Sequence, residues 1–167
     1  MPHQVVKATV RGSQGDLAKI AKALKDGVGP NHETKINILH IGGGESHEVN
    51  GIELGVITMI LEPDEPPIDG FILQAIRDVD LDPTGDHHHV AHVETYPNVH
   101  ISVLDAPGTL SGALDAVAQA DLNILSVLTM GSGGGVVDVG LAFEDETTAN
   151  AARAALSGVN VIVHPAE

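Results

Sequence analysis

The chain has 167 residues and is strongly acidic, with 23 Asp and Glu side chains against 8 Lys and Arg and a formal net charge of −15. Because nucleic-acid binding depends on Lys and Arg neutralising phosphates, this balance argues against a nucleic-acid partner, and it disfavours anionic membrane surfaces for the same reason. The absence of cysteine excludes thiol nucleophiles, disulfides and thiolate metal ligands. No apolar run approaches the ~20 residues of a membrane-spanning helix, and the N-terminus lacks a signal-peptide core. We therefore expect a cytoplasmic protein without a membrane partner.

The first half of the chain reads as alternating strands and helices. Residues 5–10 alternate in the manner of a strand, and an apolar stripe with helical spacing follows at Leu17, Ile20, Ala21 and Leu24. The other elements expected in this half are strands over 36–41, 52–61 and 88–96 and a helix around 68–76. The order is therefore strand, helix, strand, strand, helix, strand.

The second half repeats that order. After a strand expected over 99–104, Asp105 can cap a helix that carries Pro107 in its first turn. The apolar stripe of this helix is Leu110, Ala113, Leu114 and Val117. The remaining elements expected here are a buried strand over 124–128, a strand over 136–143, a helix that begins at 145–148 and a strand over 159–163.

The two halves also align with each other. Gly15-Asp16-Leu17 falls on Gly108-Thr109-Leu110, and Asn37-Ile38 falls on Asn123-Ile124. We therefore predict an α+β fold made of two ferredoxin-like βαββαβ units, over residues 1–97 and 98–167, each an antiparallel sheet with helices on one face. Because the other face of each sheet needs cover, we expect units to pair within the chain or between chains.

No residue pattern predicts catalysis. The glycine clusters at 42–44 and 131–135 lie between expected strands, and neither is followed by the Lys-Ser/Thr of a phosphate-binding loop. They are typical of hairpin tips. Ser132 is not surrounded by a G-x-S-x-G elbow. The sequence thus predicts a protein that is not an enzyme and has no cofactor.

A group of histidines is the main competing signal. Imidazole is a ligand for Zn, Ni or Cu. On a strand, His88 and His92 would point the same way and His89 the opposite way, so a single ligand set would need another chain or irregular backbone. A solvated polar loop and edge strand is the more ordinary explanation of the group, and the test for metal is whether alanine at His88 and His92 abolishes stoichiometric Zn²⁺ uptake. The histidines concerned are His87, His88, His89 and His92, with His47 and His100 as further candidates.

The segment Asp105-Ala106-Pro107-Gly108-Thr109-Leu110, followed by a helix and Leu122-Asn123-Ile124-Leu125, resembles the ACT domain, a small amino-acid-sensing module of metabolic enzymes and regulators. The D-x-P-G-x-L pattern, the Asn-Ile pair at the second strand and the closing hairpin carry the resemblance. In the first unit, Ser13-Gln14-Gly15-Asp16-Leu17 lacks the Asp and Pro of the pattern. With two such units and no catalytic domain, the chain is similar in layout to stand-alone tandem-ACT regulatory proteins.

The resemblance implies an amino-acid site at the loop between first strand and first helix. Backbone N–H groups at the helix N-terminus would bind the ligand carboxylate, and Gly108 would allow its close approach. Asp105 would accept a hydrogen bond from the ligand ammonium group, and Asn123 of a paired unit would offer a donor and an acceptor. The implied ligand-binding residues are Asp105, Ala106, Pro107, Gly108, Thr109, Leu110, Asn123, Ile124 and Leu125 in the second unit and Gln14, Gly15, Asn37 and Ile38 in the first.

The resemblance therefore implies a non-enzymatic regulatory protein. It would bind a small amino acid at unit interfaces and bias a homodimer, a higher oligomer or a partner metabolic enzyme by allosteric coupling. Two alternatives stay open: a ligand-independent regulatory subunit of a metabolic enzyme, and a metal-binding protein that uses its histidine cluster. Asp105 and Asn123 also have ordinary explanations, as a helix cap and a turn residue.

Overall fold

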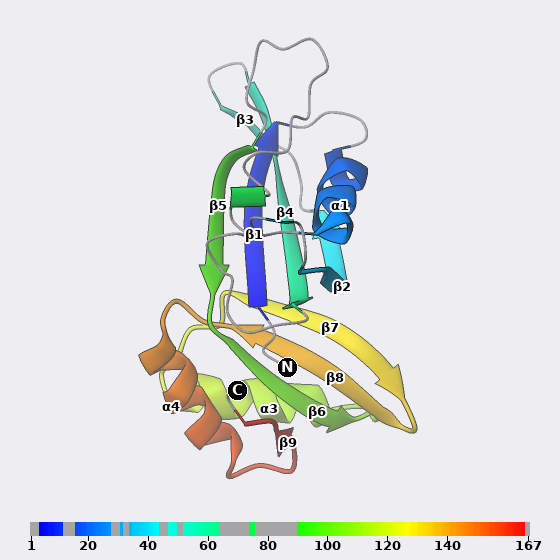
Figure 1. Cartoon of the computed structure of the whole chain (residues 1–167). Coiled ribbons are helices and arrows are strands. Elements are labelled where there is room, and N and C mark those ends of the chain that lie inside the picture. The colour runs from blue at the N-terminus through cyan, green and yellow to red at the C-terminus, as the bar shows by residue number, and fades with distance from the viewer. Residues whose placement is uncertain are drawn as a thin grey trace. The chain divides into compact units, whose positions relative to one another are not determined.

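The computed structural model describes residues 4–11, 16–27, 31, 34–43, 47–49, 52–63, 74–75 and 90–165. The chain divides into two compact units, Met1–Thr95 and Tyr96–Glu167. Each unit contains one antiparallel sheet (Figure 1). None of the helices in the described ranges is long and apolar enough to cross a membrane.

The first unit contains a sheet with strand order β2-β4-β1-β5, and a short strand β3 pairs with β4. This order places the first and third long strands side by side in the middle, as in a ferredoxin-like unit. Gln74 and Ala75 are helical, and they are the described part of the helix expected around 68–76. The elements are β1 (Gln4–Arg11), α1 (Asp16–Asp26), β2 (Ile36–Gly43), β3 (His47–Val49), β4 (Ile52–Pro63) and β5 (Val90–Tyr96).

The core of the first unit forms between α1 and the sheet. Ile20 and Leu24 project from one side of α1 and are fully buried, while Lys22 and Asp26 form an exposed pair on the same helix. This arrangement follows from the helical spacing of the apolar residues, whose burial supplies the main favourable free energy. The strand residues of this core are Val6, Ala8, Ile36, Ile57, Met59 and Leu61.

The second unit has the same strand order, β7-β8-β6-β9, with two helices. Asp145 caps α4 as expected, accepting a 2.7 Å hydrogen bond from the Thr148 N–H. The prediction of two ferredoxin-like α+β units is confirmed. The elements are β6 (Asn98–Leu104), α3 (Thr109–Gln119), β7 (Ser126–Gly133), β8 (Val136–Ala142), α4 (Glu146–Leu156) and β9 (Ile162–Val163).

Strand alternation separates the two faces of this second sheet. Val99, Ile101 and Val103 of β6 point toward the helices and are buried in the core. The residues between them therefore belong to the opposite face, among them His100 and Ser102. The rest of the core comes from α3, α4 and β8, chiefly Ala113, Val117, Val139, Leu141, Phe143, Ala149, Ala152 and Leu156.

Three local expectations were wrong in detail. The buried strand expected over 124–128 begins only at Ser126, as β7, and Leu125 just before it and Val127 within it are 41% and 43% exposed. β7 is an edge strand, so a partner strand covers only one of its sides. The last strand has two residues rather than five. The first helix of the second unit begins at Thr109, so Asp105 and Pro107 precede it and neither caps it nor lies in its first turn.

Candidate functional site

The loop that joins β6 to α3 contains the residues predicted to bind a ligand. Residues 105–108 are all exposed. The Asp105 N–H donates to Gly135 O at 2.8 Å, which extends the pairing of β6 with β8 and places the loop beside the glycine tip of the β7–β8 hairpin. Thr109 Oγ1 lies 2.5 Å from Leu104 O and 2.9 Å from Ala106 O. The hydroxyl can donate its single proton to either carbonyl, and this hydrogen bond ties the start of α3 back to the loop.

Gly108 is the N-cap residue of α3 and has a left-handed backbone conformation, with φ of 89°. A side chain there is disfavoured by the backbone, although a Cβ atom at this position would meet nothing within 4 Å. The requirement for glycine is therefore conformational, and the space around the residue is open.

The first turn of α3 offers unused donors. Among the described residues, no hydrogen-bond partner accepts from the N–H groups of Leu110 and Ser111, and no side chain caps the helix. Helix N-terminal N–H groups carry partial positive charge and suit a carboxylate. The Asp105 carboxylate is exposed and has no partner in the described ranges. The loop thus presents donors and one acceptor to solvent, while the Leu110 side chain packs partly into the core.

Asn123, Ile124 and Leu125 lie at the other end of α3. Asn123 and Leu125 are exposed, and Ile124 packs against the core. Since α3 has 11 residues, a rise of about 1.5 Å per residue separates its two ends by about 16 Å. One unit therefore does not bring Asp105 and Asn123 together. A shared site needs the Asn123 of another unit or chain.

In the first unit the corresponding positions are only partly described. Gln14 and Gly15 lie outside the described residues. Asn37 is exposed and its Nδ2 donates to Glu62 Oε2 at 3.2 Å, directly across from β2 to β4. Ile38 packs partly into the core of the first unit. The Asn37 amide thus already has a partner on the neighbouring strand.

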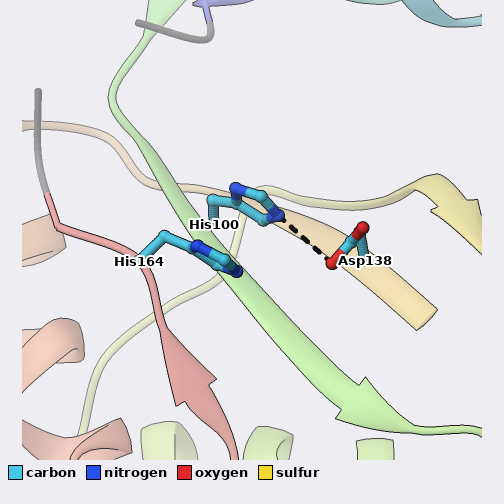
Figure 2. A group of neighbouring side chains, drawn as sticks. All are labelled: His100, Asp138 and His164. Carbon is cyan, nitrogen blue, oxygen red and sulfur yellow. Dashed lines mark ion pairs between the residues drawn. The ribbon is translucent and has the colours of Figure 1, made fainter. Parts of the chain in front are cut away.

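A polar cluster lies on the face of the second sheet opposite to α3 and α4 (Figure 2). It contains His100 of β6, Asp138 of β8 and His164, which directly follows β9. Ser102 of β6 is its fourth member, at 6% exposure. The imidazole rings of His100 and His164 stack with centroids 3.8 Å apart and planes inclined by 15°.

Strand register explains why these side chains meet. Ile101 pairs with Val163, and the His164 N–H donates to His100 O at 3.0 Å, so the two histidines face each other across the β6–β9 pair. Ser102 faces Asp138 across the β6–β8 pair, and His100 faces Gly140. Gly140 has no side chain, which leaves room for His100 to lean diagonally toward Asp138.

Hydrogen bonds organise the cluster around Ser102. Its hydroxyl donates to Asp138 Oδ1 at 2.5 Å and lies 2.7 Å from His164 Nε2, while His100 Nε2 is 3.5 Å from Asp138 Oδ1. The Ser102 hydrogen bond is the largest cause of a lowered pKa for Asp138, with smaller contributions from His100 and His164 and an opposing effect of burial.

The proton positions argue against a serine nucleophile at Ser102. A hydroxyl has one proton, and Ser102 gives it to Asp138, so His164 Nε2 must act as donor to Ser102 Oγ. A histidine in that tautomer cannot take the serine proton. The arrangement suits binding or structural roles.

Sequence reasoning missed most of this cluster. The sequence groups His100 with a different set of histidines, and Asp138 is not among the candidate ligands. His87, His88 and His89 lie outside the described residues, His47 is in β3 and His92 is in β5. The sequence does contain one signal for this cluster. His100, Ser102 and Asp138 each lie between two apolar residues on a strand, and this alternation predicts that they share the polar faces of their strands.

No protein-family model matches the sequence, and comparison with curated proteins finds no match. Solved structures do match in fold. Protein BT0572 from Bacteroides thetaiotaomicron superposes with a TM-score of 0.62 at 16% identity, over 96% of this chain and 91% of that one. The ligand-free regulatory subunit of aspartate kinase from Thermus thermophilus has a TM-score of 0.57 at 16% identity, over 95% and 93% of the two chains.

The regulatory subunit of aspartate kinase from Thermus flavus gives a TM-score of 0.52 at 16% identity, over 93% of each chain. At this identity the likeness shows the fold and leaves the activity open. The two Thermus subunits are ACT-domain proteins. The chain accordingly has the fold of these regulatory subunits, two ferredoxin-like units in tandem, as its resemblance to tandem ACT proteins implies.

Proposed function

We propose that the chain is a non-enzymatic regulatory protein that binds a small amino acid at the β6–α3 loop. The observation that carries the proposal is the exposed Asp105 carboxylate at one end of the loop and, at the other, the N–H groups of Leu110 and Ser111, which have no acceptor among the described residues. An α-amino acid has one carboxylate and one ammonium group, and the loop offers a complement to each. The regulatory subunits with the same fold support a regulatory role.

The same proposal includes pairing of units. Asn123 joins the loop in one site when a second unit lies against β7, whose outer edge is free of strand pairing among the described residues. Val127 on that edge strand and Leu125 directly before it provide exposed apolar surface. A ligand held between two units would favour the paired arrangement by its higher affinity for it. This gives a route from amino-acid binding to a homo-oligomer or to an associated metabolic enzyme.

The first experiment is a thermal-shift scan of the full chain against the twenty amino acids, followed by calorimetry on any hit. A ligand at about 100 times its dissociation constant adds about 2.7 kcal/mol. At about 2 to 4 °C per kcal/mol for a chain of this size, the melting midpoint should rise by several degrees. A flat scan at millimolar concentrations would contradict the proposal.

Asp105→Asn is the variant that tests the site. It removes the acceptor charge and should weaken binding by at least tenfold, since a charge-assisted hydrogen bond contributes about 1.5–3 kcal/mol. Asp115→Asn is the matched control, because Asp115 is an exposed carboxylate on α3 outside the loop. Equal affinities of the two variants would place the ligand elsewhere.

A second candidate is a regulatory subunit that works without a ligand. The exposed apolar side chains of Val127 on edge strand β7 and of Leu125 directly before it favour this candidate, since such an edge suits addition of a strand from another protein. Copurification with an enzyme that Val127→Lys abolishes would support this candidate, provided that the amino-acid scan is flat.

A further inference from the structure

We propose that His100, Asp138 and His164 form a binding site for a divalent transition-metal ion such as Zn²⁺. Each residue offers one ligand atom, and these atoms all lie within 4.8 Å of one another. Two imidazoles and a carboxylate are a ligand set that zinc and its neighbours in the first transition row accept. The site is separate from the β6–α3 loop and goes beyond the proposed amino-acid function.

The backbone holds the three ligands in place. They come from three neighbouring strands: Asp138 is on β8, His100 is on β6, and His164 directly follows β9. His100 and His164 face each other across one strand pair, and Asp138 is the diagonal neighbour of His100 on the other side. Figure 2 shows the two stacked rings beside the Asp138 carboxylate, with the His100–Asp138 contact dashed. Side chains fixed by strand register need little reorganisation to bind.

One of the distances between ligand atoms is already that found around a coordinated ion, and all three atoms lie within 4.8 Å of one another. Ligand atoms about 2.0 to 2.2 Å from a tetrahedral ion lie about 3.3 to 3.6 Å from each other, and His100 Nε2 is 3.5 Å from Asp138 Oδ1. His164 Nε2 lies 2.7 Å from Ser102 Oγ as the donor. To bind the ion, the ring would carry its proton on Nδ1 instead, and a small ring rotation would exchange the Ser102 contact for the ion. Ser102 would keep its hydrogen bond to Asp138 and orient the carboxylate.

Charge and access favour a cation. Residues 98–167 contain eight acidic side chains and a single basic one, Arg153, so the field of this unit attracts positive ions. The Asp138 side chain is 45% exposed and the His100 side chain 19% exposed, which gives an ion a route from solvent into a half-buried site. A hydrogen-bonded cluster that never binds metal is the competing explanation, and the experiment must separate the two.

A bound ion would fasten the C-terminal strand to the sheet. The β9 strand has two residues, and its pairing with β6 consists of Ile101 with Val163 and Ser102 with Ile162. Coordination by His164 would add a link from this short strand to both β6 and β8. We therefore expect metal binding to raise the melting temperature and to slow amide exchange in residues 161–164.

The test uses the full chain without an affinity tag, treated with a chelator and then titrated with Zn²⁺ in a calorimeter, with Co²⁺ absorption as a second readout. We expect one strongly bound ion per chain. Removing a direct ligand in His164→Ala or Asp138→Asn should lower affinity by more than about 100-fold, since even loss of a group that only orients a ligand costs about 10- to 100-fold.

Two controls keep the result interpretable. Asp138→Asn retains a group that can accept from Ser102, and melting without metal shows whether each variant is folded. A double variant, His88→Ala with His92→Ala, changes the histidine group noted from the sequence and should leave one ion bound. The proposal is overturned if the native chain binds no ion. It also fails if uptake survives in folded His164→Ala or Asp138→Asn, or is lost in the double variant alone.

Discussion

Ser102 and Asp138 face each other across β6 and β8, and the Ser102 hydroxyl donates a 2.5 Å hydrogen bond to Asp138 Oδ1. Because this bond stabilises the charged carboxylate, it is the main cause of the lowered pKa of Asp138. Ser102 itself is 6% exposed, so water competes poorly for its hydroxyl. The pair therefore couples protonation of one carboxylate to folding of the second unit.

The first prediction concerns acid stability of the metal-free protein. The pKa of Asp138 is lower in the folded protein than in the unfolded chain. The ionised carboxylate therefore makes its full contribution to the free energy of unfolding above the unfolded pKa of about 3.9. This contribution is lost as the pH falls through the folded pKa. Ser102→Ala should move the Asp138 pKa upward and reduce this acid-dependent loss. Titration of the Asp138 carboxyl carbon by NMR measures the shift. Ser111→Ala, a serine change on α3, should leave that titration unchanged.

The second prediction contrasts two glycines at one helix end. Gly108 has φ of 89° and Gly112 lies inside α3, and a Cβ at either position would meet nothing within 4 Å. Gly108→Ala should destabilise by about 1 kcal/mol or more because the left-handed conformation is costly for alanine. Gly112→Ala should stabilise by about 0.5 to 1 kcal/mol because alanine favours helix. Urea unfolding compares both with the native chain, and shifts of the same sign would contradict the φ-based argument.

Much of the fold was accessible from the sequence because its determinants are local. The stripe at Ile20 and Leu24 and the alternation at Val99, Ile101 and Val103 both follow from the period of the element and the burial of one face. The hairpin at Gly134 and Gly135 was accessible for the same reason, since both have positive φ and only glycine adopts this readily.

The start of α3 was not accessible in the same way. Asp105 was expected as a cap because its residue type favours that position. The backbone instead keeps Asp105 paired to the Gly135 carbonyl, and Thr109 closes the loop on Leu104 O and Ala106 O. The N-cap is therefore Gly108, three residues later than expected, and the hydrogen bonds that decide this depend on tertiary structure.

The polar cluster depends on register, which one sequence does not specify. His164 lies 64 positions after His100, and the two meet because β9 pairs with β6 at Ile101 and Val163. A shift of one residue would turn His164 to the helix-covered face. The alternation of His100 and Ser102 marks a polar face, but its partners become known only once the strands are paired.

Arg153 supports the last prediction. It is the single Lys or Arg after residue 97, and its side chain is 17% exposed on α4. Its guanidinium donates to the Asn98 carbonyl at 3.0 Å, to Asn150 Oδ1 at 2.7 Å and to Glu146 Oε1 at 2.9 Å, so it joins α4 to the start of β6.

Arg153→Met should therefore lower the free energy of unfolding by about 1.5 to 3 kcal/mol, the range for hydrogen bonds to charged groups. Methionine keeps much of the apolar stem, so the loss reports mainly on the polar contacts. Glu146→Ala should cost less than about 1 kcal/mol because Glu146 is 60% exposed and water screens the ion pair. Urea unfolding followed by circular dichroism measures both. Equal losses in the two variants would mean that the ion pair with Glu146, which lies within α4, accounts for the stabilisation and that the bond to the Asn98 carbonyl of β6 adds little.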